Sequence, residues 1–335
     1  MKRKKIVVLP AIIVFAVFVI VAAPFLGIES ISLNEIFHVS TGNIKANIFW
    51  KIRIPRVLTA FCAGAALAIS GMVFQAMFRN PLATPFTLGV SSGAAFGAAL
   101  YVKLGLVFSI LGTSGQTVSS FLGAVISIFF VYGMTRLKKG FSTATMLIAG
   151  VAINFFFSSL ILFIQYLSDF ANSFRIIRWL MGGVEIVGYA PVLSLLPFFV
   201  IGSLIVLALT NELNLMMLGE DIAVSRGVAV KKIKALLFFA TSIMVGGVVS
   251  VCGPIGFVGM MAPHICRLLI GANHRYLMPA TFVFGGAFLV FCDTLARTII
   301  APAEIPVGII TALLGGPFFL WLLLGGSSER SSLSF

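Results

Sequence analysis

Long apolar runs separated by short polar segments make up most of this chain. A helix that crosses a membrane needs about 20 mainly apolar residues, and ten runs approach or exceed that length. They cover residues 6–26, 57–78, 86–107, 117–136, 143–168, 190–210, 233–251, 256–270, 278–298 and 306–325. The eighth run is the shortest and contains Gly259 and Pro263. The pattern predicts a single all-α, polytopic membrane domain over residues 1–335, with ten transmembrane helices.

The composition indicates that lipid is the main solvent of this domain. Of the 335 residues, 60% are hydrophobic and only 10% are charged, and the mean hydropathy is +1.13. A soluble domain carries about 25% charged residues, so this chain has too few polar side chains to cover a water-facing surface. In a soluble protein the net charge of +13 would suggest a nucleic-acid partner. Here the basic residues form short clusters between apolar runs, which indicates membrane topology, and we expect no nucleic-acid partner.

The positions of the basic residues predict that both termini lie in the cytoplasm. Residues 2–5 are all Lys or Arg, and the apolar run that follows is longer than the 7–15 residues of a signal-peptide core. We interpret this run as a first transmembrane helix with its basic end inside, and ten spans return the C-terminus to the same side. Most of the 23 basic residues then lie inside, as the positive-inside rule requires. The exceptions on the outer side are Lys45, Lys51, Arg53, Arg56, Lys103, Arg175, Arg178 and Arg297.

Two segments interrupt the helical pattern in a similar manner. Residues 79–85 follow the second span and residues 253–259 follow the seventh, and proline or glycine recurs in both. Similar breaks in two halves of a membrane protein suggest an internal repeat. It would relate residues 57–168 to residues 233–325 in inverted orientation, because the second span runs inward and the seventh outward. The alternative is that glycine and proline are common in membrane helices without any repeat.

One predicted cytoplasmic segment, residues 211–230, is amphipathic. Leu215, Leu218 and Ile222 recur at helical spacing, and Gly219 and Gly227 are placed to end two short helices. Two short helices at the inner face predict a docking site for another protein. The alternative is a helix that lies on lipid, but such helices are usually basic and this segment contains several acids.

Motifs for nucleotide or hydrolytic chemistry are absent or out of context. A phosphate-binding loop needs a Gly-Lys pair, and the chain has none, so we expect no ATPase activity from it. Gly89, Ser91 and Gly93 match the serine-hydrolase pattern, and a membrane protease would pair Ser91 with His264, but that motif needs a preceding strand. Close helix contacts through small residues explain it better. The four cysteines form no CxxC pair and the three histidines are scattered, so we expect no metal site and no bound cofactor.

Few ionisable residues fall within the apolar runs. Asp293, Arg297 and Glu304 lie near the outer ends of the ninth and tenth spans, where long side chains can reach the membrane surface. A carrier driven by protons would be expected to have carboxylates across the membrane. Their absence weakens the interpretation as a secondary transporter or channel, which we keep as the alternative from another class.

Several motifs, in a specific order and spacing, lead to a family. They are residues 53–56, 71–75, 79–85, 88–94, 253–259, 263–264, 304–308 and 315–318, together with Leu218, Gly219, Ala223, Gly227, Arg267, Asp293 and Arg297. By these motifs the chain resembles the FecCD-type permeases of ABC importers, which take up vitamin B12, ferric siderophores and haem.

The resemblance implies a BtuC-like type II importer fold, in the cytoplasmic membrane of a prokaryote. It implies a homodimer that encloses the pathway, two separate ATPase subunits that use ATP and Mg at the inner face, and a substrate-binding protein at the outer face. The chain would then be a transport subunit without catalytic residues. We expect a metal chelate as substrate, with ferric siderophore first, and haem, cobalamin or an oxyanion such as molybdate still open.

The resemblance also implies roles for individual residues. The ATPase-coupling residues would be Leu218, Gly219, Glu220, Asp221, Ala223, Arg226 and Gly227. Arg53, Arg56 and Arg297 would meet acidic groups of the binding protein, and the alternative for the first two is anchoring at the membrane interface. The fifth span would line the pathway, with a short outer helix near residues 172–181. The pathway residues would include Asn154, Gln165, Tyr166, Gly253, Pro254 and Phe257.

Overall fold

The protein was analysed as a computed structural model that describes residues 2–37, 44–110, 112–137 and 143–325. Each predicted span coincides with a helix. These helices are α1 (Lys2–Ala22), α4 (Ile54–Phe78), α5 (Val90–Lys103), α6 (Gly115–Leu137), α7 (Thr143–Tyr166), α9 (Ala190–Ala208), α12 (Val230–Cys252), α13 (Val258–Ile270), α14 (His274–Thr298) and α15 (Val307–Gly325). The prediction of a polytopic helical fold is therefore confirmed.

The shorter elements lie between these helices. They are α2 (Leu33–Phe37), α3 (Ile44–Ile48), the π-helical turn η1 (Phe49–Arg53), the 3₁₀ turn η2 (Pro85–Leu88), α8 (Phe170–Leu180), α10 (Thr210–Leu218), α11 (Glu220–Ser225), β1 (Ser109–Ile110) and β2 (Thr113–Ser114). α8 is the predicted short outer helix, and Asp169 caps it by accepting a hydrogen bond from the Asn172 amide at 3.3 Å. The two strands pair antiparallel, so the fold is not strictly all-α.

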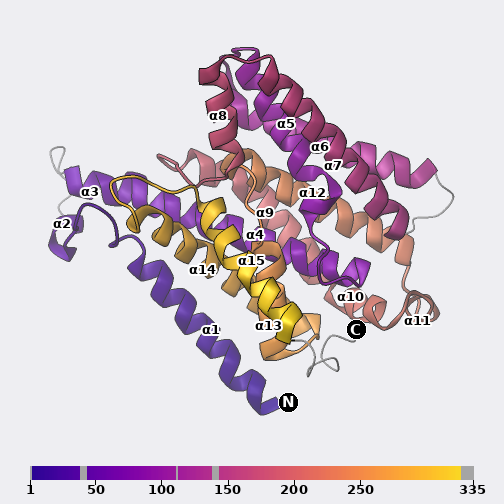
Figure 1. Ribbon diagram of the computed structural model, residues 1–335. Helices are drawn as coiled ribbons and strands as arrows, with labels where there is room; N and C mark the ends of the chain where they lie inside the picture. The colour runs from indigo at the N-terminus through magenta and orange to yellow at the C-terminus, as the bar shows by residue number, and fades with distance from the viewer. Residues whose placement is uncertain (1, 38–43, 111, 138–142, 326–335) are drawn as a thin grey trace.

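Membrane-spanning capacity differs among the ten helices. Within the described residues, six helical segments are long and apolar enough to cross a membrane. The apolar parts of α1, α13 and α15 are shorter, and α5 has only 14 residues because Gly89, with a φ of 77°, separates it from η2. Ten crossings therefore stay a prediction. The start of α1, the end of α15 and α10–α11 lie at one end of the molecule, and α2, α3 and α8 lie at the other (Figure 1).

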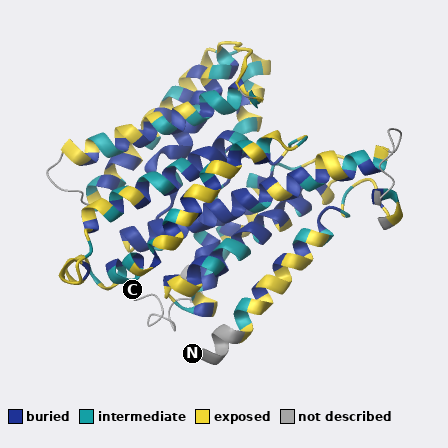
Figure 2. Cartoon of the chain, turned by 180° about the vertical axis from the view of Figure 1, so that it is seen from behind, coloured by how far each residue is buried: buried dark blue, intermediate teal, exposed yellow. Residues whose placement is uncertain are grey.

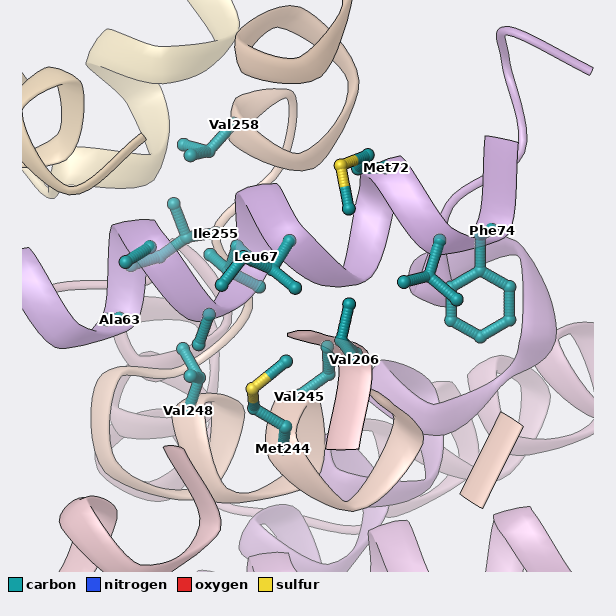
Figure 3. Packing of buried hydrophobic residues seen from close by; sticks show 14 of the residues in the cluster. Ala63, Leu67, Met72, Phe74, Val206, Met244, Val245, Val248, Ile255 and Val258 are labelled. Atoms are coloured by element: carbon teal, nitrogen blue, oxygen red, sulfur yellow. The ribbon is translucent and has the colours of Figure 1, made fainter. Parts of the chain in front are cut away.

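α4 is the centre of the bundle. Its apolar segment is 83% buried, and α9, α12, α13 and α14 pack around it. Leu67 of α4 lies near side chains of α9 and α12, such as Val206 and Val245, while Met72 lies on the opposite side of α4 (Figure 3). Exposed residues cover the periphery of the bundle, while its interior is almost entirely buried (Figure 2).

Glycines allow α4 to approach its neighbours closely. A Cβ atom added at Gly71 would lie 1.7 Å from the Gly259 carbonyl oxygen of α13, and one at Gly64 would lie 2.3 Å from the Gly285 oxygen of α14. No side chain fits in either place without moving the helices apart. Small residues at these contacts act as they do in other membrane bundles, where tight backbone packing holds helices together.

Both predicted breaks are present, and they share a backbone feature. Among the described residues, Arg79 and Phe257 are the non-glycine residues with positive φ, at 47° and 66°. One lies in each break. The inverted repeat itself stays a prediction.

Candidate functional site

The segment predicted to dock a cytoplasmic partner folds as two short helices with a sharp turn between them. α10 ends at Gly219, whose φ and ψ are both 144°, a conformation that L side chains rarely adopt. α11 is followed by Gly227, with a φ of 83°. Both glycines end helices, as predicted. We call residues 214–227, from the second half of α10 to Gly227, the coupling turn.

The coupling turn has a buried side and an exposed apolar side. Met216 and Ala223 pack inward and are at most 2% exposed, so Ala223 belongs to the interior. Leu218, Ile222 and Val224 are 68%, 46% and 60% exposed. Clustered exposed apolar side chains with polar neighbours are typical of a protein-interaction surface. Asp221 and Arg226 are exposed next to them, which leaves charged groups available to a partner.

α10 is anchored to the start of α14. The Asn214 carboxamide oxygen accepts the backbone amide of His274 at 2.8 Å and lies 2.9 Å from the His274 Nδ1 atom. His274 is fully buried. The turn is therefore joined to a long helix of the bundle through a polar contact that the sequence did not reveal.

Glu220, which the sequence analysis assigned to ATPase coupling, pairs with a buried lysine of the same chain. Its carboxylate lies 2.5 Å from the Nζ atom of Lys234 in α12, and the Lys234 side chain is only 2% exposed. Charged side chains are rarely buried without a partner, because removing them from water costs several kcal/mol. Glu220 thus neutralises a buried lysine and ties α11 to α12, which limits its availability to a partner protein.

Reversal of the Glu220 charge should lower the free energy of unfolding. Glu220→Lys leaves Lys234 buried beside a second cation, and we expect a loss of more than the ~1 kcal/mol of an exposed pair, below the 3–5 kcal/mol of a fully buried one. Thermal unfolding of the purified protein measures the loss. Asp221→Lys makes the same charge change at an exposed position and should leave the unfolding temperature unaltered. Equal effects of the two substitutions would contradict the assignment.

The three outer arginines predicted to dock a binding protein point into the fold. Arg56 of α4 forms a fork on Asp293 of α14, with N–O distances of 2.9–3.1 Å, and donates to Glu304 at 2.9 Å. Arg53 donates to the carbonyl oxygens of Pro24 at 2.9 Å and Glu29 at 2.5 Å.

Arg297 completes the same cluster. Its Nε atom lies 3.9 Å from Asp293, and its Nη2 atom donates to the Ala23 carbonyl oxygen. Arg53, Arg56 and Arg297 are only 5–8% exposed. Docking needs an accessible guanidinium group, and in this structure these three groups are used to join α1, α4 and α14. The sequence analysis places these arginines at the surface because the contact between Arg56 and Asp293, 237 positions apart, depends on helix packing.

A cavity of about 440 Å³ lies against α7, and its lining carries no charged side chain. Its polar lining residues are Ser91, Ser92, Asn154, Ser158 and Gln165, and its apolar ones are Phe86, Ala95, Ile161, Leu162, Leu180 and Pro254. Asn154, Ser158 and Gln165 lie on one face of α7 by helical spacing. Polar side chains within a membrane helix are normally directed to protein or to a water-filled space, so this face is unsuited to lipid.

The pathway prediction agrees with this cavity for three of its six residues: Asn154, Gln165 and Pro254 line it. Tyr166 is 85% exposed at the end of α7 and is not among the lining residues. Gly253 is packed against the Trp179 carbonyl oxygen, and the Phe257 ring lies against Gly315 of α15. The last two position the break between α12 and α13 instead of lining the cavity.

The sequence analysis missed the serines of this cavity. Ser91 and Ser92 belong to the family motif of residues 88–94, but the sequence analysis assigned neither of them to the pathway, and it did not single out Ser158. None of the described residues that line the cavity is a histidine, and neither ring nitrogen of the buried His264 has a hydrogen-bond partner. The geometry therefore offers Ser91 as a polar wall residue, without a neighbouring base.

Helices too apolar for water, a polar cavity on one face and an anchored turn at one end define a multi-pass membrane transport protein. The FecCD transport family profile matches residues 13–325, and the chain belongs to this family of ABC importer permeases. It is 36% identical over 325 residues to the hemin transport system permease HmuU of Yersinia pestis, with 96% of each chain covered. It is 43% identical over 276 residues to the cobalamin import permease BtuC of Halobacterium salinarum, covering 81% of this chain and 72% of that one.

A solved structure has the same fold. A chain of a metal-chelate type ABC transporter in an inward-facing conformation superposes with a TM-score of 0.85 at 33% identity, covering 95% of this chain and 99% of that chain. The prediction of a BtuC-like importer permease is confirmed. The family contains permeases named for different cargoes, so the substrate of this chain is a separate question.

Proposed function

We propose that this chain is the membrane-spanning subunit of an importer for a metal chelate, driven by ATP that separate subunits hydrolyse. The observation that carries the proposal is the coupling turn. It presents Leu218, Ile222 and Val224 to solvent while Glu220 and Asn214 anchor it to long helices. A rigid apolar projection of this kind can pass a partner's movement to the bundle.

A second copy of this chain is proposed to pack against α7 and α15. Both helices carry large exposed apolar side chains, and the polar cavity opens on the exposed face of α7. A second copy would cover this face and complete the cavity across a twofold axis, the commonest symmetry of homo-oligomers. A substrate-binding protein would approach the opposite end from the coupling turn. We propose that this end of the molecule faces the outside of the cell and that both termini lie in the cytoplasm. The complex would lie in the cytoplasmic membrane of a prokaryote.

Docking of the binding protein is proposed at the same outer end. Since Arg53, Arg56 and Arg297 are buried, they would stabilise the helices beneath this surface and would contact the binding protein only if docking exposed them. Lys51 and Arg175 are exposed and are better placed to attract acidic side chains.

Ferric siderophore is the proposed substrate class. The uncharged cavity lining, with hydroxyl and carboxamide groups, suits a chelate whose metal charge is shielded by its own ligand. An anionic cargo such as molybdate would find no cation there. Titration of the cognate binding protein with ferric siderophores, haem, cobalamin and molybdate separates these possibilities.

The test of the function is co-expression and purification with a candidate ABC ATPase subunit from the same organism. We expect a complex with two copies of each subunit, ATP hydrolysis only when the ATPase is present, and uptake into vesicles that requires ATP. Hydrolysis by this chain alone, or uptake driven by an ion gradient without ATP, would refute the proposal.

A further inference from the structure

Arg79 occupies a backbone position that suits glycine. It is the residue that ends α4, with φ of 47° and ψ of 40°, in the left-handed region. Glycine is the usual residue at such a position because other L-residues are destabilised there. A non-glycine residue held in this region suggests that its side chain has a role that outweighs the backbone strain.

The Arg79 side chain reaches the coupling turn. Its Nη2 atom donates to the Met216 carbonyl oxygen at 3.2 Å, at the C-terminal end of α10. The same oxygen also accepts the Gly219 amide at 3.3 Å. Carbonyl groups in the last turn of a helix carry partial negative charge, so a guanidinium is well matched to this one as a second donor. The same Nη2 atom lies 3.9 Å from where a Cβ atom of Gly219 would be. Arg79 therefore contacts the coupling turn at its sharpest bend.

The backbone that follows Arg79 leads to the cavity. The Asn80 side chain accepts the Leu82 amide at 2.9 Å, and the Asn80 carbonyl accepts the Ala83 amide at 3.1 Å. Thr84 is the N-cap of η2, and its carbonyl oxygen accepts a hydrogen bond from the Thr87 hydroxyl at 2.6 Å. Phe86 in η2 lines the cavity. A short hydrogen-bonded segment thus joins the end of α4 to the cavity wall.

We propose that Arg79 is a positioning residue that transmits movement of the coupling turn to residues 80–86 and so changes the access to the cavity at Phe86. This inference rests on the proposed function, since the movement would come from docked ATPase subunits. Asn214 and Glu220 also anchor the coupling turn, but they connect it to α14 and α12, whereas Arg79 connects it to the segment that lines the cavity.

The test uses Phe86→Cys as a reporter in inside-out membranes that contain the ATPase complex. A water-soluble maleimide labels the thiol, and the labelling rate is compared between the nucleotide-free state and the state trapped with ATP and vanadate. We expect about a tenfold difference with Arg79 present and less than about twofold in Arg79→Gly. Arg79→Gly suits the left-handed backbone, so thermal stability and ATPase co-purification should be retained. Arg79→Lys, which keeps a cationic donor, should restore part of the difference.

The matched control is Arg275→Met, which removes an exposed arginine of α14. It should leave the tenfold difference unchanged. If Arg79→Gly keeps the full difference, the inference is overturned. If Arg79→Gly unfolds or loses the ATPase, Arg79 is a structural residue and the inference is also wrong. If the reporter with Arg79 present binds no ATPase, the proposed function itself fails, and the inference fails with it. If it binds the ATPase but its labelling does not change with nucleotide, the inference alone is overturned.

Discussion

Asp293→Asn should lower the free energy of unfolding by about 3–5 kcal/mol, the usual cost of removing one partner from a buried ion pair. Asp293 is 1% exposed and lies between Arg56 and Arg297. Without its charge, the two buried guanidinium groups face each other with only the more exposed Glu304 to compensate. Thermal or denaturant unfolding of the purified protein in detergent measures the effect.

The control is the exposed pair formed by Arg178 and Glu185, whose side chains are 58% and 43% exposed. Glu185→Gln should cost no more than about 1 kcal/mol. The same experiment decides between the two interpretations of the outer arginines. If Asp293→Asn keeps the unfolding free energy of the unmodified protein but no longer binds the binding protein, the cluster serves docking, as its sequence position suggested. If stability falls and the exposed Arg175 proves to govern salt-dependent docking, the cluster belongs to the fold.

Gly219→Val should abolish uptake while the protein stays in the membrane. The added side chain has space, since the nearest atom to a Cβ would be Ile222 Cδ1 at 3.5 Å. The backbone is the obstacle, because φ and ψ near 144° are almost restricted to glycine. Strain of about 1–3 kcal/mol would displace the coupling turn and disfavour its docked geometry by about 5- to 150-fold. Uptake into vesicles and ATPase co-purification are measured together.

Gly133→Val provides the matched control for this experiment. Gly133 lies in α6, its φ is not in the left-handed region, and no atom would lie within 4 Å of an added Cβ. It should therefore support normal uptake. Normal uptake by Gly219→Val as well would place the coupling surface elsewhere. Residues 136–140, of which 138–140 lie outside the described residues, would be the next candidate.

The positions of the helices were largely predictable from the sequence. Spans 117–136 and 143–168 match α6 and α7 closely, since a membrane helix must satisfy its backbone within a continuous apolar segment. The start of α5 was misplaced by several residues, because the apolar run continues through a 3₁₀ turn that hydropathy does not distinguish. The glycines of the coupling turn were also predicted correctly, since a helix end with positive φ is a local requirement.

By itself, the sequence determined the properties that depend on neighbouring residues: a multi-pass helical membrane protein, its two breaks, the two short helices of the coupling turn and, through its motifs, its family. Only the tertiary structure decided which charges are paired. Arg56 and Asp293 are 237 positions apart, and Arg79 and Met216 are 137 apart, so their contacts depend on helix packing. The same packing decided that Asn154 and Gln165 line the cavity while Tyr166 does not. Hydropathy reports the preference of each residue for lipid or water, whereas the partner of a buried polar group is set by which helices lie side by side.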